Sequence, residues 1–321
     1  MRELIEGCLM PELKGGYAKL GEDDSAVLSR PDGRIALTTD SYVVNPIFFP
    51  GGNIGDLAVN GTVNDLSMSG ATPLYITVGL IVEEGLPVSE LTAILRSMKK
   101  AADLAGVSIV AGDTKVVDRG KADRIFINTA GVGVLTDGVE ISAGNLRPGD
   151  RILVSGTLGD HGMAVMSVRD GLSFGTDITT DSAPLNSLVR DMLAACPEIH
   201  ALRDPTRGGL AATLNEFAAS SGVGIIIDEK TLPVRDDVRG ACEMLGLDPL
   251  YVANEGKLAA AVPAGKADSV LAAMKANRYG SDSAIIGEVV SEPRGKVLIK
   301  TLIGGTRILD MLAGELLPRI C

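Results

Sequence analysis

The chain has no tryptophan, and its 321 residues include only five phenylalanines and five tyrosines. It is also short of positive charge, with a formal net charge of −11 at pH 7. Single-stranded nucleic acids bind to basic grooves lined with aromatic side chains, and anionic membranes bind to basic surfaces. The composition therefore argues against both kinds of partner. It does not exclude a nucleotide, because carboxylates can hold phosphates through Mg²⁺.

Long hydrophobic runs are also missing. The most apolar segments, such as residues 76–82, are as long as a strand and far shorter than the ~20 residues of a membrane-spanning helix. Residues 1–11 lack the cationic stretch and long apolar core of a signal peptide. We therefore expect no membrane contact and a cytoplasmic location.

Cysteine is scarce, with Cys8, Cys196, Cys242 and Cys321 as the four examples, none of them in C-x-x-C spacing. This pattern argues against a zinc site and against a disulfide framework. Cys321 stands out because it is the last residue. A thiol on a mobile tail can visit one active site and then another, although the neighbouring terminal carboxylate should raise the thiol pKa. The alternative is an incidental cysteine in a frayed tail.

Strand and helix patterns alternate in both halves of the chain, which predicts two α/β domains of similar size. A Pro-Gly turn at residues 148–149 places the boundary there, giving domains 1–147 and 148–321. The predicted strands are residues 34–39, 74–82, 107–111, 124–135, 151–155, 223–228, 258–262, 285–290 and 297–300. The predicted helices are residues 52–69, 91–105, 185–193, 208–220, 234–245 and 264–277.

Acidic residues recur at the ends of these elements, in five motifs at residues 21–26, 38–41, 63–66, 112–115 and 204–209. The strand pattern places Asp40 and Asp113 at carboxyl ends, where ligands bind in α/β domains. Several carboxylates in one cleft repel each other unless a cation neutralises them, and oxygen ligands favour Mg²⁺ beside phosphates. A single aspartate after a strand is more often a turn or cap residue, but the set of five favours a site.

Glycines and two charged residues complete the candidate site. Gly51 and Gly52 precede a helix, and residues 156–162 form a second glycine-rich link; both could present N–H groups to phosphates, although tight turns also need glycine. Neither the Walker pattern nor the dinucleotide-binding pattern is present. Lys115 and Glu255 could act as acid, base or charge clamp if they lie in a cleft, although such residues more often lie on the surface.

Taken together, these motifs resemble the PurM-like ATP-binding superfamily, which includes aminoimidazole ribonucleotide synthetase, thiamine monophosphate kinase and selenophosphate synthetase. Residues 38–66 and 112–117 and the ending P-R-I-C at 318–321 are most similar to the HypE family of hydrogenase maturation proteins. The resemblance covers essentially the whole chain. It implies an α/β fold of the α+β type, with the N-terminal domains of a homodimer completing a β-barrel and ATP bound near that interface.

The resemblance also implies a reaction. A HypF-type carbamoyltransferase would place a carbamoyl group on Cys321. The chain would then dehydrate this S-carboxamide to an S-cyanate with ATP. The cyano group would pass to iron on a HypC–HypD complex and become a cyanide ligand of [NiFe]-hydrogenase.

Site residues follow by resemblance. Asp40, Asp65, Asp113 and Asp204 are the expected Mg²⁺ ligands. The expected ATP-binding residues are Asp24, Asp40, Gly52, Asn64, Asp65, Asp113 and Thr114. Lys115 and Glu255 are expected to polarise and deprotonate the carboxamide, and the sequence leaves open which of the two is the base.

Two other functions compete with this one. Selenophosphate synthetase uses a reactive residue near its N-terminus that is followed closely by lysine, whereas Cys8 is followed by Leu9, Met10 and Pro11. That difference disfavours selenophosphate synthesis. A non-catalytic ATP-binding scaffold with Cys321 as a passive carrier is left to experiment.

Overall fold

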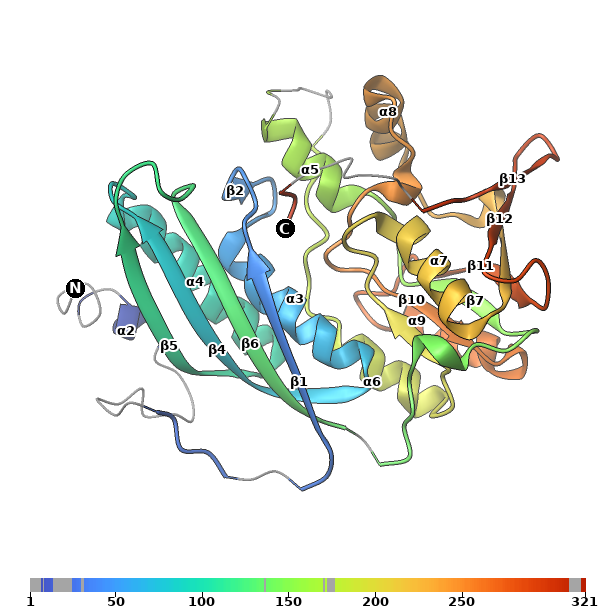
Figure 1. Cartoon of the computed structure of the whole chain (residues 1–321), viewed down its shortest axis with the longest axis horizontal. Helices are drawn as coiled ribbons and strands as arrows, with labels where there is room; N and C mark the ends of the chain where they lie inside the picture. The colour runs from blue at the N-terminus through green and yellow to red at the C-terminus, as the bar shows by residue number, and fades with distance from the viewer. Residues whose placement is uncertain are drawn as a thin grey trace.

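The computed structural model describes residues 7, 9–13, 25–29, 32–135, 137–169, 171, 177–311 and 319–321. Each half of the chain forms its own sheet (Figure 1). The N-terminal sheet has the order β1-β6-β4-β5. Its strands are β1 (Ile35–Tyr42), β4 (Ala71–Glu83), β5 (Ser108–Val117) and β6 (Ile125–Leu135). Only the β4–β5 pair is parallel. Two short strands, β2 (Phe48–Phe49) and β3 (Gly52–Asn53), pair with each other.

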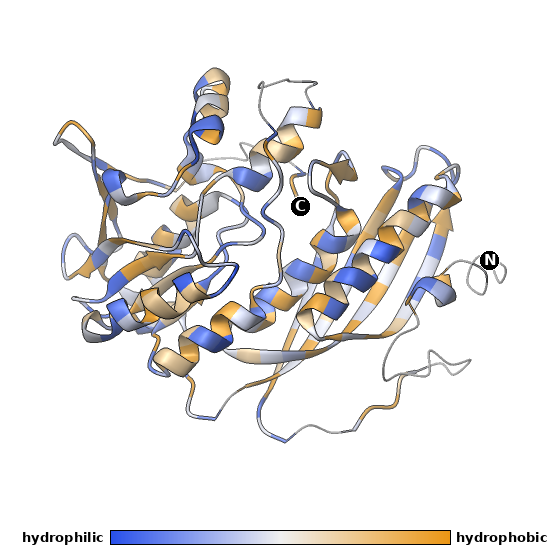
Figure 2. Cartoon of the chain, turned by 180° about the vertical axis from the view of Figure 1, so that it is seen from behind, coloured by the Kyte–Doolittle hydropathy of each residue, from blue (hydrophilic) through white to orange (hydrophobic). Residues whose placement is uncertain are grey.

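One face of the N-terminal sheet is covered by two helices, α3 (Ile54–Met68) and α4 (Val88–Ala105). They lie behind the strands in Figure 1 and in front of them in Figure 2. A four-residue helix, α2 (Met10–Leu13), packs beside α4. The opposite face carries exposed apolar side chains, with Leu37 74% and Ile81 44% exposed. This sheet therefore has one buried face and one open face.

The C-terminal sheet has the order β13-β12-β9-β11-β7-β10-β8 and is antiparallel except for the pair β12–β9. Its strands are β7 (Arg151–Val154), β8 (Ala201–Arg203), β9 (Gly224–Asp228), β10 (Ala259–Val262), β11 (Ala284–Val290), β12 (Val297–Lys300) and β13 (Thr306–Ile308).

Helices cover both faces of this second sheet. The helix α7 (Gly209–Ser221) packs on the face that carries Ile152 and Val154, whereas α6 (Asn186–Ala195) and α9 (Ala267–Ala276) pack on the face of Leu153. The helices α5 (Asp160–Arg169) and α8 (Asp236–Leu245) share a smaller core. Short 3₁₀ turns occur at Ala143–Asn145, Glu229–Thr231, Pro249–Tyr251 and Ala264–Lys266.

Most of the predicted elements are confirmed, and the predicted ends of two strands are wrong. The strands β1 and β5 continue through Asp40 and Asp113, so neither aspartate follows a strand end. The reason is pairing, because β6 accompanies β1 as far as Tyr42 and β4 accompanies β5 as far as Val117. The β1 strand lies at the edge of the sheet, and its outer face is open.

Three further points concern the extent of the fold. The predicted domain boundary lies between the end of β6 at Leu135 and the start of β7 at Arg151, and it stays a prediction. Cys8 and the predicted ATP residue Asp24 lie outside the described residues. In the part of the chain that the structure describes, no helix is both long enough and apolar enough to span a membrane.

Candidate functional site

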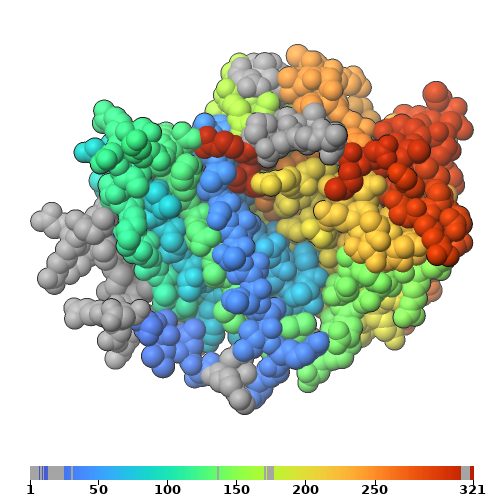
Figure 3. All heavy atoms as spheres, viewed as in Figure 1, coloured from blue at the N-terminus to red at the C-terminus, as the bar shows by residue number. Residues whose placement is uncertain are grey.

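A cleft of about 780 Å³ opens between the two domains. The N-terminal domain contributes Asp40 and Asp65 to its wall, and the C-terminal domain contributes Asp204, Arg207 and Glu255. The end of the chain also lines it, through Arg319, Ile320 and Cys321. In Figure 1 the C-terminus lies between the domains near β2, and Figure 3 shows the red end of the chain against the atoms of the N-terminal half.

The last three residues lie along the segment that follows β1. The carbonyl oxygen of Cys321 accepts a hydrogen bond from the Val43 N–H at 3.1 Å, and the carbonyl oxygen of Arg319 accepts one from the Asn45 N–H at 3.3 Å. The Ile320 side chain is buried in the N-terminal core. These contacts hold the thiol of Cys321 at the wall of the cleft.

Three aspartates bring negative charge into the cleft. Burial raises the pKa of Asp204 to about 7, and the nearby charges of Asp65 and Asp40 add to this rise. Burial also raises the pKa of Asp65, although the Thr38 hydroxyl donates to Asp65 Oδ2 at 2.8 Å and opposes the rise. Like charges that raise the pKa of a buried neighbour indicate a site that a cation would stabilise.

Glu255 is the most deeply buried of these acids, with 3% of its surface exposed. Burial raises its pKa well above the ordinary value, and the charges of Asp204 and Asp181 raise it further. Its Oε1 atom has no hydrogen-bond partner among the described residues. A carboxyl group of this kind donates a proton when neutral and is a strong base when ionised.

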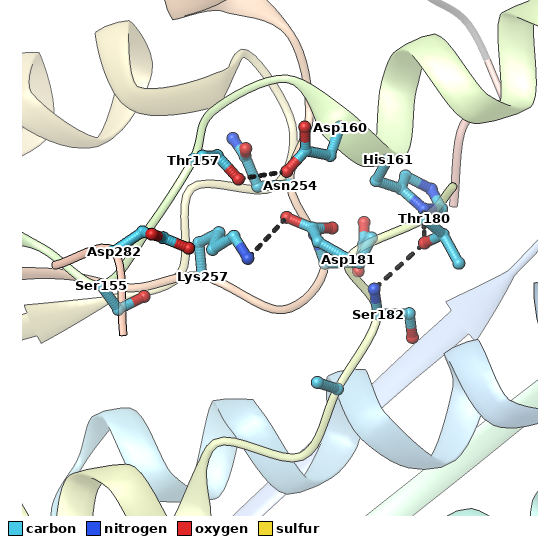
Figure 4. A network of polar contacts seen from close by, with 12 residues as sticks. Ser155, Thr157, Asp160, His161, Thr180, Asp181, Ser182, Asn254, Lys257 and Asp282 are labelled. Carbon is cyan, nitrogen blue, oxygen red and sulfur yellow. Dashed lines mark hydrogen bonds and ion pairs between the residues drawn. The ribbon is translucent and has the colours of Figure 1, made fainter. Parts of the chain in front are cut away.

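Neighbouring polar groups hold the backbone of Glu255 in place, and Figure 4 shows two of the residues involved, Asp181 and Lys257. The Glu255 N–H donates to Asp181 Oδ1 at 2.9 Å, and Lys257 Nζ lies 4.0 Å from Asp181 Oδ2. The Asn64 amide donates to the carbonyl oxygens of Glu255 and Ala183 at 3.2 and 3.1 Å. Asn64 is therefore a buried residue of the N-terminal domain that hydrogen-bonds to the C-terminal domain. A contact between Asn64 and ATP stays a prediction.

Cys321 has an unreactive thiol in this position. Burial raises the pKa of the thiol to about 12, and the charges of Glu255 and Asp40 contribute to the rise, whereas Arg207 lowers it. At neutral pH the sulfur is protonated. A protonated sulfur is a poor nucleophile, so the thiol is inert while the tail lies in this position.

Three predicted site residues lie away from the cleft, on β5. Lys115 Nζ pairs with the Asp113 carboxylate at 2.7 Å, and both side chains are mostly exposed. The hydrogen bond from Lys115 is the main cause that lowers the pKa of Asp113. The register places Asp113 opposite Gly79 and Lys115 opposite Ile81, which puts both on the open face of the sheet, and Thr114 lies between them. Within one chain, this group does not join Asp40, Asp65 and Asp204.

Gly52 also lies outside the cleft wall. A Cβ atom there would stand 2.7 Å from Asp56 Oδ2, so the close approach of this side chain explains the glycine. The Asn53 N–H donates to Asp56 Oδ1 and the Gly55 N–H donates to Asn53 Oδ1, which occupies amides at the start of α3. The phosphate role predicted for Gly52 stays a prediction.

The second glycine-rich link, residues 156–162, is similarly occupied by protein contacts. The Gly159 N–H donates to Asn254 Oδ1 at 2.7 Å, and the Gly162 N–H donates to the Ala253 carbonyl oxygen at 3.1 Å. Two of its backbone amides therefore hold the segment of residues 253–254, which directly precedes Glu255. Its predicted contact with phosphates stays a prediction.

Sequence reasoning missed two contributors to the site. His161 stands in the glycine-rich link 156–162 without an assigned role, and Asp181 belongs to no motif; their contacts join residues far apart in the chain. Arg207 stood inside a recognised motif without an assigned role. Among the described residues, no group of three or more His, Cys, Asp or Glu side chains is arranged to hold a metal ion. The predicted metal set therefore stays a prediction.

Two domains of one known protein family match the two halves of the chain. The N-terminal domain of the AIR synthase related protein family matches residues 22–135, and the C-terminal domain of that family matches residues 147–300. Carbamoyl dehydratase HypE of Azotobacter vinelandii is 53% identical over 321 residues, covering 100% of this chain and 94% of the relative. The Escherichia coli K12 protein of the same name is 47% identical, with coverage of 100% and 96%.

Solved structures agree with these relatives. A crystal structure described as hydrogenase maturation protein HypE in complex with ATP superposes with a TM-score of 0.95 at 48% identity, covering 100% of this chain and 96% of that one. A HypE–HypF complex gives a TM-score of 0.85 at 51% identity, with coverage of 96% and 99%. Thiamine-monophosphate kinase from Stenotrophomonas maltophilia has a TM-score of 0.69 at 21% identity, with coverage of 92% and 95%, and shows a shared fold alone.

Proposed function

This chain belongs to the HypE family of carbamoyl dehydratases, and from that premise we propose that it uses ATP to dehydrate a carbamoyl group carried on Cys321. The observation that carries the proposal is the place of Cys321, at the wall of a cleft that also holds Glu255 and three aspartates. A group bonded to this sulfur would lie within the acidic cleft of the same chain.

The chemistry has two steps that balance. The carboxamide oxygen attacks the γ-phosphorus of ATP, an N–H proton leaves, and the products are ADP and an imidate phosphate on Cys321. The C–O bond then breaks as the second N–H proton leaves, which releases phosphate and forms the C≡N bond of the S-cyanate. Phosphorylation is needed because the amide oxygen is otherwise a very poor leaving group, and each proton needs a positioned base.

Glu255 is the residue of the cleft that suits the role of base. Its high pKa makes the carboxylate a strong proton acceptor, and its Oε1 atom has no partner among the described residues. Asp181 and Asn64 hold its backbone in place. Burial of the carrier favours a neutral carbamoyl group over a thiolate, which agrees with the raised pKa of Cys321.

The residues of the cleft also fit a magnesium nucleotide. Asp40, Asp65 and Asp204 supply the oxygen donors that Mg²⁺ prefers. The helix α7 has Gly208 as its N-cap, next to Arg207, and no side-chain hydrogen bond caps it, so its first turn suits phosphate oxygens. When bound, Mg²⁺ would neutralise phosphate charge and relieve the repulsion that raises the pKa of Glu255.

A homodimer would bring the residues of β5 to this site. The strands β1 and β5 are the two edges of the N-terminal sheet, and the open face between them carries Leu37 and Ile81. If two such sheets pack face to face and close into a barrel, β5 of one copy lies beside β1 of the other. Asp113 and Lys115 of a second copy would then approach Asp40.

The remaining parts of the proposal concern partners and location. A HypF-type carbamoyltransferase would load Cys321, and a HypC–HypD complex would accept the cyano group in the cytoplasm. The HypE–HypF complex among the similar structures supports the first of these partners.

The proposed activity is tested on the chain carbamoylated at Cys321. Addition of ATP and Mg²⁺ should remove the mass of one water from the C-terminal peptide and release ADP and phosphate. The uncarbamoylated chain is the control for unrelated ATP hydrolysis. An adduct of unchanged mass, on a chain shown to bind ATP, would support the passive scaffold instead.

A further inference from the structure

His161 lies in the first turn of α5 and is fully buried, yet the proposed chemistry does not use it. Both ring nitrogens have a partner. Nε2 lies 3.0 Å from the carbonyl oxygen of Ile320, and Nδ1 lies 2.7 Å from the hydroxyl oxygen of Thr180. Figure 4 shows the His161 ring and the Thr180 hydroxyl pointing toward one another. The imidazole therefore joins the tail to the segment that leads to Asp181.

The partners of the ring fix its tautomer. A carbonyl oxygen only accepts hydrogen bonds, so Nε2 carries the proton that is donated to Ile320. Burial lowers the pKa of His161 to about 4, so the ring is neutral at neutral pH and Nδ1 is an acceptor. The Thr180 hydroxyl then donates to Nδ1, while its oxygen accepts from the Ser182 N–H at 3.0 Å. In this row of hydrogen bonds, from Ser182 through Thr180 and His161 to Ile320, each donor therefore faces one acceptor.

The docked tail has a backbone conformation that needs such support. Arg319 has a φ of 56°, in the left-handed region that a residue with a side chain rarely adopts. The Arg319 side chain donates to the Val43 carbonyl oxygen at 3.1 Å, and Arg169 donates to the Arg319 carbonyl oxygen. These contacts hold Arg319, and the Val43 N–H holds the Cys321 carbonyl oxygen, whereas His161 holds Ile320 itself.

We propose that His161 is a positioning residue for the tail, and that Thr180 holds its ring in the tautomer that donates to Ile320. Because Ile320 directly precedes Cys321, this hydrogen bond sets how far the thiol reaches along the cleft wall toward Glu255. A neutral hydrogen bond is weak enough to break when the tail leaves for another protein. The effect of this hydrogen bond on turnover rests on the proposed function. Its role in docking the tail is independent of that function.

The test measures how often the tail leaves the cleft, without any activity. Cys321 in the full-length chain is alkylated with iodoacetamide, and the peptide that ends in Cys321 is followed by mass spectrometry. His161→Ala should raise the alkylation rate about fivefold to tenfold, as expected for one lost hydrogen bond. Thr180→Val should raise it by a smaller factor, because the ring can then adopt either tautomer.

Conservative and distant variants separate the hydrogen bond from simple packing. His161→Gln keeps a side-chain N–H donor, and Thr180→Ser keeps the hydroxyl, so both should return the rate toward the unsubstituted value. His200→Ala is the matched control, since His200 pairs with Asp150 at 2.7 Å and neither residue lines the cleft. It should leave the rate unchanged.

Two results would overturn the proposal. One is an unchanged alkylation rate in both His161→Ala and Thr180→Val, and the other is an equal increase in His161→Ala and His161→Gln. If His161→Ala does not fold, the alkylation rate of Thr180→Val tests the proposal alone, and an unchanged rate overturns it. With a carbamoylated tail, His161→Ala should slow dehydration while loading continues. Faster alkylation without any dehydration in the unsubstituted chain would keep the docking role and reject the proposed function.

Discussion

Glu255 and Cys321 line the same cleft, and the negative charge of Glu255 is, after burial, the largest cause that raises the pKa of the Cys321 thiol. The two side chains come from residues 66 positions apart (321 − 255) and meet because the tail folds back onto the segment after β1. Burial, and to a lesser extent the carboxyl group that would act on the loaded carrier, thus keep the empty thiol protonated.

Replacing Glu255 by glutamine removes this charge at nearly constant volume. The pKa of Cys321 should fall, because an anion that opposes the thiolate is gone, but it should stay raised because burial remains. Alkylation of Cys321 at pH 8–9 should become several-fold faster. Dehydration of the carbamoylated chain should slow by about 10²- to 10⁴-fold, as expected when a general base is lost.

The matched control for this variant is Glu216→Gln. Glu216 lines the same cleft but pairs with Arg203 at 2.8 Å, and it is not among the causes of the Cys321 shift. It should leave the alkylation of Cys321 unchanged. Equal alkylation rates in Glu255→Gln and the unsubstituted chain, measured across the pH range, would contradict the assigned coupling.

Asp204 should make the protein less stable as the pH rises. Its pKa is about 7 in the folded chain and 3.8 ordinarily, so between these values the folded state binds more protons than the unfolded state. The free energy of unfolding then falls as the pH rises through this window. In Asp204→Asn this fall should be smaller, leaving the variant more stable at pH 8 by about 1–3 kcal/mol.

Urea unfolding between pH 4 and pH 8, without nucleotide or metal, measures this effect. Asp118→Asn, at an exposed turn, is the control and should follow the unsubstituted chain. Adding Mg²⁺ should stabilise the unsubstituted chain more than Asp204→Asn, because the cation neutralises the cluster that Asp204 completes. Parallel pH profiles for Asp204→Asn and the unsubstituted chain would show that Asp204 does not titrate in this window.

The fold was largely predictable because its helices carry strong local patterns. Leu91, Ile94 and Met98 recur at helical spacing and are buried in α4. Strand ends were less predictable, because they depend on how far a neighbouring strand extends. Asp40 looks like the residue after a strand, but β6 pairs with β1 for two residues beyond it. The three-residue strand β8 exists through its pairing with β10 and has no pattern of its own.

The candidate site was predictable where its residues stand in motifs. Asp40, Asp65, Asp204, Glu255 and Cys321 were all proposed from sequence, and all line one cleft, although their roles stay predictions. Residues that act through others carried no such signal. The His161–Ile320 contact spans 159 positions and the Glu255–Asp181 contact spans 74, and only the folded chain shows that these residues meet.

Cys321 should be required for loading and dispensable for folding. Cys321→Ser keeps the backbone carbonyl that accepts from Val43 and removes only the sulfur. This variant should unfold within about 0.5 kcal/mol of the unsubstituted chain and bind ATP equally well. It should accept no stable carbamoyl group from the carbamoyltransferase, as judged by intact mass. A carbamoyl adduct elsewhere on the variant would reject Cys321 as the carrier.

The last prediction tests whether two copies share one site. Lys115 lies on the edge strand β5, away from the cleft of its own chain, whereas Glu255 lies inside that cleft. If Lys115 acts in the cleft of a second copy, Lys115→Ala and Glu255→Gln should each be nearly inactive alone. In mixed dimers one of the two sites regains both residues, so random mixing should restore roughly a quarter of the unsubstituted activity.

A control mixture of two variants distinguishes a site shared between two copies from a site formed within one chain. Glu255→Gln mixed with Asp204→Asn combines two defects of the same cleft. If both residues act in the cleft of their own chain, a mixed dimer retains one defect in each site, so activity should stay near zero. Dehydration of the carbamoylated chains, measured before and after unfolding and refolding the mixtures together, gives the comparison. No recovery in the Lys115→Ala mixture, with mixed dimers verified by mass, would place Lys115 outside the shared site.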